Sequence, residues 1–127
     1  MVAELRAAVY NPLSFMEQTR SEIFRQMAEA QPDNEMIWYG LASECLKEER
    51  WSEATTALRR VIALKPDYTA AYQMLGTALA QQGETVEARQ IWTQGIAVAN
   101  SAGAWKAQQH MQGLLDNTPI SGPDFCE

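Results

Sequence analysis

The sequence is poor in the residues from which catalytic and metal sites are usually built. It contains a single histidine, His110, and two cysteines, Cys45 and Cys126, among 127 residues. A metal centre or a nucleophile–base pair needs several such groups that converge in space, and His110 has no evident companion. We therefore expect His110 to be a surface residue, Cys45 to lie in the core, and the protein to have no catalytic residue, metal or cofactor.

Positive charge is also scarce, since 10 Lys and Arg residues face 16 Asp and Glu residues and the net charge is −6. A chain without a basic stripe is poorly suited to a phosphate backbone, so we expect no nucleic-acid partner. The longest apolar runs are far too short to span a membrane. The stretch MVAELRAAVYNP lacks the pattern of a signal peptide, and two distant cysteines do not indicate a disulfide framework. These features predict a cytoplasmic protein.

What the sequence does contain is a repeat. The stretches EMIWYGLASECLKEERWSEA and TAAYQMLGTALAQQGETVEA begin 34 residues apart. The matching pairs are Trp38–Tyr72, Leu41–Leu75, Ala42–Gly76, Cys45–Leu79, Ala54–Ala88 and Leu58–Trp92, and the pair Pro32–Pro66 extends the register backwards. The apolar residues recur with the i, i+3, i+4, i+7 spacing of a buried helix face. A fixed period of this size is typical of stacked helical hairpins.

The pattern also predicts where the helices begin and end. We expect helices near residues 15–30, 34–48, 52–64, 68–82, 85–99 and 103–116, with a short helix near 2–10 before them. Ser14, in a capping box with Glu17, and Asp67 are the expected N-caps, and Gly83 is the expected left-handed C-cap. The turn KEERWSEA has no glycine, so a different cap is predicted there.

Small residues predict where helices cross closely. Ala42 and Gly76 on the first helix of each pair would face Ala54 and Ala88 on the second. Gly95 lies one helical turn from Trp92, and we expect it to let the last helix, through Trp105, pack beside that indole.

These residues resemble the tetratricopeptide repeat family, and the sequence is similar to small bacterial proteins that consist mostly of such repeats. The resemblance rests on Trp38, Leu41, Ala42, Ala54, Leu58 and Pro66 in the first copy and on Tyr72, Leu75, Gly76, Gly83, Ala88 and Trp92 in the second. The departures are Cys45 and Leu79 for a tyrosine, Gly95 for an alanine and Asn100 for the closing proline. The resemblance implies an all-α, right-handed solenoid of antiparallel helix hairpins with a C-terminal capping helix.

The implied organisation has three parts. An N-terminal segment at 1–13 precedes a helical domain at 14–116, and an irregular tail follows at 117–127. Within the domain we expect a half repeat at 15–33, full repeats at about 34–67 and 68–101, and a capping helix at 103–116.

In this family the first helices of successive repeats line a concave groove that binds peptides or partner helices. The corresponding residues are Met36, Tyr39, Ser43, Lys47, Gln73, Thr77 and Gln81. This lining is mostly neutral and capable of hydrogen bonding, so it suits a protein segment of modest charge. Family members that bind acidic chaperone tails carry Lys, Asn and Arg across the groove, whereas this chain has Tyr39, Gly40, Ser43, Ala70 and Met74 there. The sequence argues against that function.

The function that these features favour is non-catalytic: an adaptor or scaffold that holds a segment of a partner protein in the groove. The alternative is a small acidic chaperone or assembly factor that shields an apolar segment of a client. An enzyme is a third interpretation, without a set of catalytic residues in the sequence to support it.

Two surfaces outside the groove stay open as contact sites. Residues 68–102 carry few charges, and the amphipathic segment at 1–12 could lie in its own groove or mediate self-association through the termini.

Overall fold

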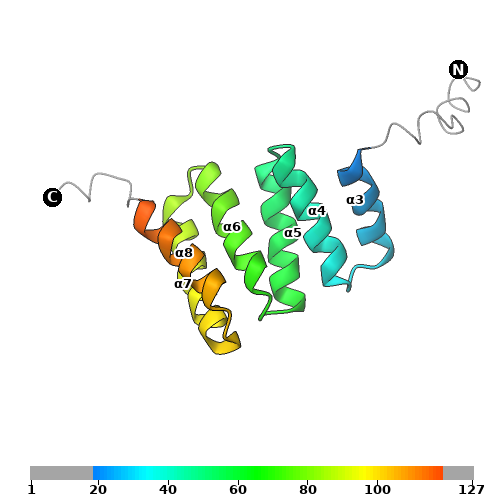
Figure 1. Cartoon of the computed structure of the whole chain (residues 1–127). Helices are drawn as coiled ribbons and strands as arrows, with labels where there is room; N and C mark the ends of the chain where they lie inside the picture. Colours follow the sequence, from blue (N-terminus) through cyan, green and yellow to red (C-terminus); the bar gives the residue numbers. More distant parts are fainter. Residues whose placement is uncertain (1–18, 119–127) are drawn as a thin grey trace, which may run out of the picture.

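The computed structural model describes residues 19–118, and within this range α-helices joined by short loops are the only regular secondary structure (Figure 1). The helices are α3 (Arg20–Ala30), α4 (Glu35–Lys47), α5 (Trp51–Leu64), α6 (Thr69–Gln81), α7 (Thr85–Ala102) and α8 (Trp105–Asn117). The predicted all-α class is confirmed. The predicted helix near 2–10 and the predicted capping box of Ser14 and Glu17 lie outside the described residues. The division of the chain into segment, domain and tail stays a prediction.

Consecutive helices pack against one another along a stack, with α3 and α8 at its opposite ends (Figure 1). The second helices of the hairpins, α3, α5 and α7, form one layer that is joined by a repeated ion pair. Arg25 on α3 meets Glu53 on α5 at 2.7 Å, and Arg59 on α5 meets Glu87 on α7 at 2.8 Å. Both partners of the second pair lie 34 residues after those of the first. The first helices, α4, α6 and α8, form the other layer, in which α6 contacts α8. The predicted solenoid is confirmed.

A second repeated contact explains why an aromatic residue and a proline recur in each copy. The Trp38 indole N–H donates to the Pro32 carbonyl at 2.8 Å, and the Tyr72 hydroxyl donates to the Pro66 carbonyl at 2.7 Å. Proline ends the preceding helix. The polar group of the aromatic side chain then donates a hydrogen bond to the carbonyl of that proline. Each aromatic residue thereby fixes the loop that leads into its own helix.

The predicted close crossings are confirmed, because Ala42, Gly76, Ala54 and Ala88 are all buried. At Gly76 the space is filled by a side chain of α7. A Cβ atom at this position would overlap the Trp92 indole ring. Trp92 itself is 2% exposed and is the largest fully buried side chain of the described residues. The glycine is therefore needed to admit the indole between α6 and α7.

Gly95 also lies at a close contact, but the predicted partner is wrong. Trp105 is 60% exposed and does not fill this space. The fully buried Met111 does, since a Cβ atom on Gly95 would lie 2.5 Å from its sulfur and 2.6 Å from the Cβ of Tyr72. The last helix does press against α7 at this glycine, but with the side of α8 that carries Met111.

Two predicted helix starts differ from the structure. Helix α3 begins at Arg20 rather than at residue 15, because Thr19 is an extended N-cap that forms a capping box with Glu22. At α6 the N-cap is Tyr68, which makes no side-chain capping bond. The prediction of Asp67 for that role was wrong by one residue.

Helix α7 is longer than predicted and runs to Ala102. The reason is Asn100, which stands where the preceding repeat has Pro66. Without a proline the backbone N–H groups stay available for helical hydrogen bonds, and the helix continues until Gly103, which has a left-handed φ of 72°. The chain therefore turns into α8 later than the repeat period would place it.

The turns that end α4 and α6 are the same, contrary to the prediction. Gly83 takes a left-handed φ of 84°, as expected, and Glu84 N–H donates to the Leu79 carbonyl at 2.8 Å. Glu49 takes the same conformation at φ 59°, and Arg50 N–H donates to the Cys45 carbonyl, also at 2.8 Å. The geometry of the hairpin imposes this cap, so a non-glycine residue accepts the strain where no glycine is present.

Replacement of Glu49 by glycine should therefore stabilise the protein. A left-handed conformation costs a residue with a Cβ atom about 1 kcal/mol, so we expect Glu49→Gly to raise the free energy of unfolding by roughly 0.5–1 kcal/mol. Urea denaturation followed by circular dichroism would measure the change. The reverse substitution, Gly83→Glu, should destabilise by a similar amount, and a destabilised Glu49→Gly variant would contradict the strain argument.

Candidate partner-binding surface

The seven predicted contact residues all lie on first helices of the hairpins. We call them the first-helix face; it consists of Met36, Tyr39, Ser43 and Lys47 on α4 and of Gln73, Thr77 and Gln81 on α6. Their spacing places each set along one side of its helix. Met36, Lys47 and Gln81 are the more accessible members, whereas the other four are partly buried. The face is thus a row of solvent-accessible side chains, four of which are partly held by packing against their neighbours.

An aromatic pair joins the two helices of this face. The rings of Tyr39 on α4 and Tyr68, the N-cap of α6, have centroids 5.1 Å apart and an interplanar angle of 34°. Burial, with smaller effects of Tyr39 and Glu35, raises the pKa of Tyr68, so its phenol stays neutral. Met36, one turn before Tyr39, is 67% exposed. Together these side chains offer an apolar and aromatic contact area near the start of α4.

The α6 part of the face is polar and is tied to the core. The Gln73 carbonyl accepts two hydrogen bonds, from the Thr77 hydroxyl at 3.1 Å and from the Trp92 indole N–H at 3.2 Å. The Thr77 oxygen keeps its acceptor capacity, and the Gln73 side chain keeps its amide donors and acceptor. The position of these groups depends on the buried indole behind them.

The single cation of the face is already paired. Lys47 Nζ lies 3.4 Å from a carboxylate oxygen of Glu44, and Arg20 Nε lies 3.1 Å from the same oxygen. The hydrogen bond from Arg20, assisted by Lys47, holds the pKa of Glu44 below its usual range against the opposing effect of burial. Lys47 therefore contributes little free positive charge, and the first-helix face is close to neutral.

Helix α8 extends the face, which the sequence interpretation missed. Helices α4, α6 and α8 each have 13 residues. Gln109 and Gly113 hold the places in α8 that Gln73 and Thr77 hold in α6, and Gln109 is exposed. The 34-residue register hid this correspondence, because the longer α7 shifts α8 along the chain.

Two ionisable residues elsewhere in the hairpins, Cys45 and Glu53, have pKa values shifted by burial and by hydrogen bonding. Cys45 is fully buried as a free thiol, and burial raises its pKa to about 11. Glu53 accepts a hydrogen bond from Arg25, which lowers the pKa of its carboxyl. A protonated, inaccessible thiol is not a nucleophile, and His110 is exposed on α8. Between Thr19 and Thr118 no group of three or more His, Cys, Asp or Glu residues could hold a metal ion.

Three surface depressions of the described residues lie away from the first-helix face. One of about 440 Å³ lies on α7, one of about 400 Å³ between the α5–α6 loop and the end of α7, and one of about 520 Å³ at the α3–α4 loop. None of the three is lined by a residue of the first-helix face.

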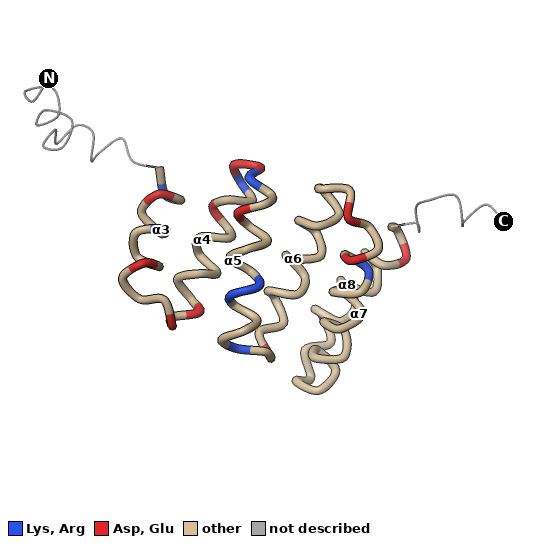
Figure 2. The backbone as a smooth tube through the Cα atoms, turned by 180° about the vertical axis from the view of Figure 1, so that it is seen from behind, with Lys and Arg blue, Asp and Glu red and all other residues tan. Residues whose placement is uncertain are grey.

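Charge is distributed unevenly along the stack. Charged positions gather on α3, α4 and α5, whereas α6 carries none (Figure 2). The middle of the first-helix face thus consists of amides, hydroxyls and small apolar side chains. Loss of hydration costs such groups less than it costs charged groups.

Three comparisons agree with this architecture. A family model described as tetratricopeptide repeat matches residues 45–111. A TPR repeat-containing protein of Pseudomonas aeruginosa is 33% identical over 83 residues, which cover 65% of this chain and 79% of the relative. A protein of Bordetella parapertussis with a known solution structure has a TM-score of 0.70 and 29% identity over 80% of this chain and 88% of its own. A tetratricopeptide repeat domain protein of Salinibacter ruber has a TM-score of 0.63 and 28% identity over 67% of this chain and 94% of its own.

The stacked hairpins with their repeated ion pair and repeated aromatic–proline bond define a helical repeat protein. The chain belongs to the tetratricopeptide repeat family. Proteins of this family are in general non-catalytic modules for protein–protein interaction. None of the helices described between residues 19 and 118 combines the length and the apolar character that a membrane crossing requires.

Proposed function

We propose that this protein is a non-catalytic adaptor that binds a segment of one partner protein along the first-helix face. The observation that supports this most directly is the row of side chains on α4 and α6, continued by Gln109 on α8. It combines the Tyr39–Tyr68 pair with amide groups and has almost no free charge. Such a surface fits an extended or helical segment with an aromatic or aliphatic anchor and few charges. A cytoplasmic location belongs to the same proposal and is supported by the free thiol of Cys45.

The test is affinity capture from the native cell lysate with matched variants. The variant of the face combines Tyr39→Glu with Thr77→Arg, which places opposite charges on α4 and α6. The control combines Thr56→Glu with Ser101→Arg, which places the same two charges on α5 and α7 of the other layer, where both side chains are exposed. Circular dichroism spectra and unfolding midpoints must show that both variants fold.

The proposal expects one or a few proteins to be captured by the wild type and by the control, and to be lost with the Tyr39→Glu, Thr77→Arg variant. Calorimetry with the identified segment should then give a one-to-one complex, weakened more than about tenfold in that variant, since loss of a hot-spot anchor costs about 2 kcal/mol or more and about 1.4 kcal/mol is already tenfold. Equal capture by all three proteins, or capture by none, would contradict binding at this face.

The chaperone alternative differs in what happens to the partner. Exposed Met36 beside Tyr39 favours it, because methionine adapts to varied apolar segments. A chaperone should suppress aggregation of its client and release it on delivery, whereas an adaptor should stay bound to a fixed motif. Light scattering of the isolated partner with and without this protein separates the two.

A further inference from the structure

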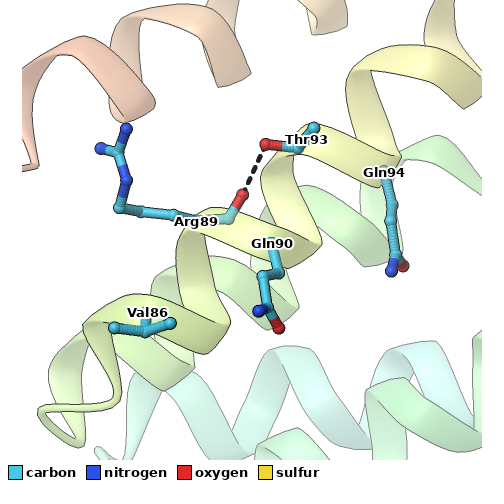
Figure 3. A pocket seen from close by; sticks show the side chains of 5 residues that line it. All are labelled: Val86, Arg89, Gln90, Thr93 and Gln94. Atoms are coloured by element: carbon cyan, nitrogen blue, oxygen red, sulfur yellow. Dashed lines mark hydrogen bonds between the residues drawn. The ribbon is translucent and has the colours of Figure 1, made fainter. Parts of the chain in front are cut away.

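The outer side of α7 carries a depression that none of the helices between residues 19 and 118 covers. It measures about 440 Å³ and is lined by Val86, Arg89, Gln90, Thr93 and Gln94. Figure 3 shows these side chains arranged along successive turns of one helix. Val86 is 57% exposed, and Gln90, Thr93 and Gln94 are at least in part accessible as well. The apolar Val86 side chain therefore lies open to solvent among the hydrogen-bonding groups of three uncharged residues and Arg89.

The position of this depression in the repeat indicates what kind of element would pack there. Its residues lie 34 positions after five residues of α5. In α5 that side packs toward the next second helix, since Thr55 is 7% exposed and Arg59 reaches Glu87 on α7. On α7 the equivalent places are Arg89 and Thr93. The depression is thus the place where a further second helix would pack if the array continued.

The last described residue, Thr118, lies next to this depression. In the two complete hairpins the second helix follows the first after a short turn, so the residues after α8 would reach the side of α7 in the same way. Arg89 fixes the exit: its Nη1 atom donates to the carbonyls of Leu115 at 2.8 Å and Thr118 at 2.6 Å. In Figure 3 the Arg89 side chain extends from α7 toward the end of another helix. The last described residue is therefore held at the wall of the depression.

The sequence that follows suits an extended strand in a shallow groove. The residues 119–127 read PISGPDFCE. Pro119 and Pro123 disfavour a helix and favour extended backbone, while Ile120 and Phe125 supply apolar side chains for the exposed Val86. Nine residues reach up to about 30 Å, and Val86 to Gln94 spans about 12 Å of helix. The amides of Gln90 and Gln94 can both donate to and accept from an extended backbone, and the Thr93 oxygen can still accept, since its hydroxyl donates to the Arg89 carbonyl at 2.8 Å.

We propose that residues 119–127 of the same chain lie in the α7 depression, in the place where a further second helix would pack. The tail covers Val86 and closes the end of the array, as capping elements do in repeat proteins. This surface lies in the opposite layer from the first-helix face, and the inference does not depend on the proposed function.

A disulfide trap tests this in the full-length chain. Gln90→Cys places a thiol in the depression, and the tail carries Cys126. Cys45 does not compete, because it is fully buried and its pKa is raised to about 11. Oxidised glutathione accepts the two electrons and two protons that are released when the thiols join. Mass spectrometry detects the loss of two hydrogens in the monomer, and peptide mapping assigns the bond.

Two control positions separate docking from the mere tethering of the tail. Gln112→Cys on α8 lies about 9 Å along the helix from Thr118, well within reach of the tail. Thr56→Cys is the counterpart of Gln90 on α5. Since docking raises the effective concentration of the tail thiol, we expect the 90–126 bond to form about tenfold faster than a bond at either control position. Arg89→Ala in the Gln90→Cys protein should remove most of that advantage.

Two outcomes would overturn the inference. Equal rates at positions 90 and 112 would mean that the tail only samples the volume around its attachment point. Predominant formation of disulfide-linked dimers would mean that the depression takes the tail of a second copy instead. Gel filtration of the wild type at the same concentration would then show the dimer directly. Because each cysteine replaces a side chain outside the core, circular dichroism should find all of these variants folded.

Discussion

Replacement of Gly95 by leucine should lower the thermal unfolding midpoint by several degrees. A Cβ atom at this position already approaches the Tyr72 Cβ to 2.6 Å and the Met111 sulfur to 2.5 Å. The Met111 side chain is flexible and can move, but the Tyr72 Cβ is fixed to the backbone of α6. Overpacking of a filled core costs about 1–3 kcal/mol, and each kcal/mol shifts the midpoint of a domain this size by roughly 4 °C. Differential scanning calorimetry or circular dichroism would measure the loss.

Gly113→Leu is the matched control for this substitution. It also replaces a helical glycine by leucine, but nothing lies within 4 Å of a Cβ atom at that position. Leucine has a better helix propensity than glycine, by about 1 kcal/mol, so the control should be neutral or slightly stabilising. A Gly95→Leu protein as stable as the Gly113→Leu protein would mean that α8 packs differently against α7.

Gly95 also shows how far a sequence can be interpreted physically. The 34-residue period and the helical spacing of apolar residues predicted the hairpins, the buried small residues and the left-handed Gly83. They did not predict which residue of α8 meets Gly95. That depends on where α7 ends, because a shift of two residues turns a helix by about 200°. The end of α7 in turn depends on Asn100, which departs from the repeat pattern. For this reason Met111, and not the predicted Trp105, lies against Gly95.

The same cause limited the prediction of the first-helix face, the surface that we propose for partner binding. The residues on α4 and α6 share one register, so a single period identified all seven of them. Gln109 lies outside that register and was missed, although its helix has the length of the other two. The repeated ion pair of Arg25 with Glu53 was missed for another reason. Its partners come from different repeats, and spacing within one repeat carries no signal for a contact between repeats.

Cap geometry was predictable only where the residue type required it. Gly83 indicated its left-handed conformation, since glycine is the residue that adopts it without strain. Glu49 gives no such signal, because its conformation is imposed by the crossing of α4 and α5 rather than by its own preference. Tertiary packing therefore decides the backbone at such positions.

Replacement of Trp92 by alanine should destabilise the protein even more than Gly95→Leu does. The indole fills the space above Gly76, is 2% exposed, and donates to the Gln73 carbonyl at 3.2 Å. Truncation of a buried aromatic residue costs about 3–5 kcal/mol, a large share of the roughly 5–15 kcal/mol typical of a domain. We expect the unfolding midpoint to fall by roughly 12–20 °C. Urea and thermal denaturation would give both quantities.

The loss should be local as well as large, because each repeat of such an array contacts only the neighbouring repeats. Amide hydrogen exchange should accelerate most in α6, α7 and α8, while α3 and α4 keep more of their protection. The Gln73 backbone would also lose a hydrogen bond that fixes its position, so binding at the first-helix face should weaken in the fraction that remains folded.

Trp105→Ala is the control: this indole is 60% exposed, and its removal should change stability by about 0.5 kcal/mol at most. Similar losses for the two tryptophans, or a loss under about 1 kcal/mol for Trp92→Ala, would contradict a stack held together at α6 and α7 by that buried ring.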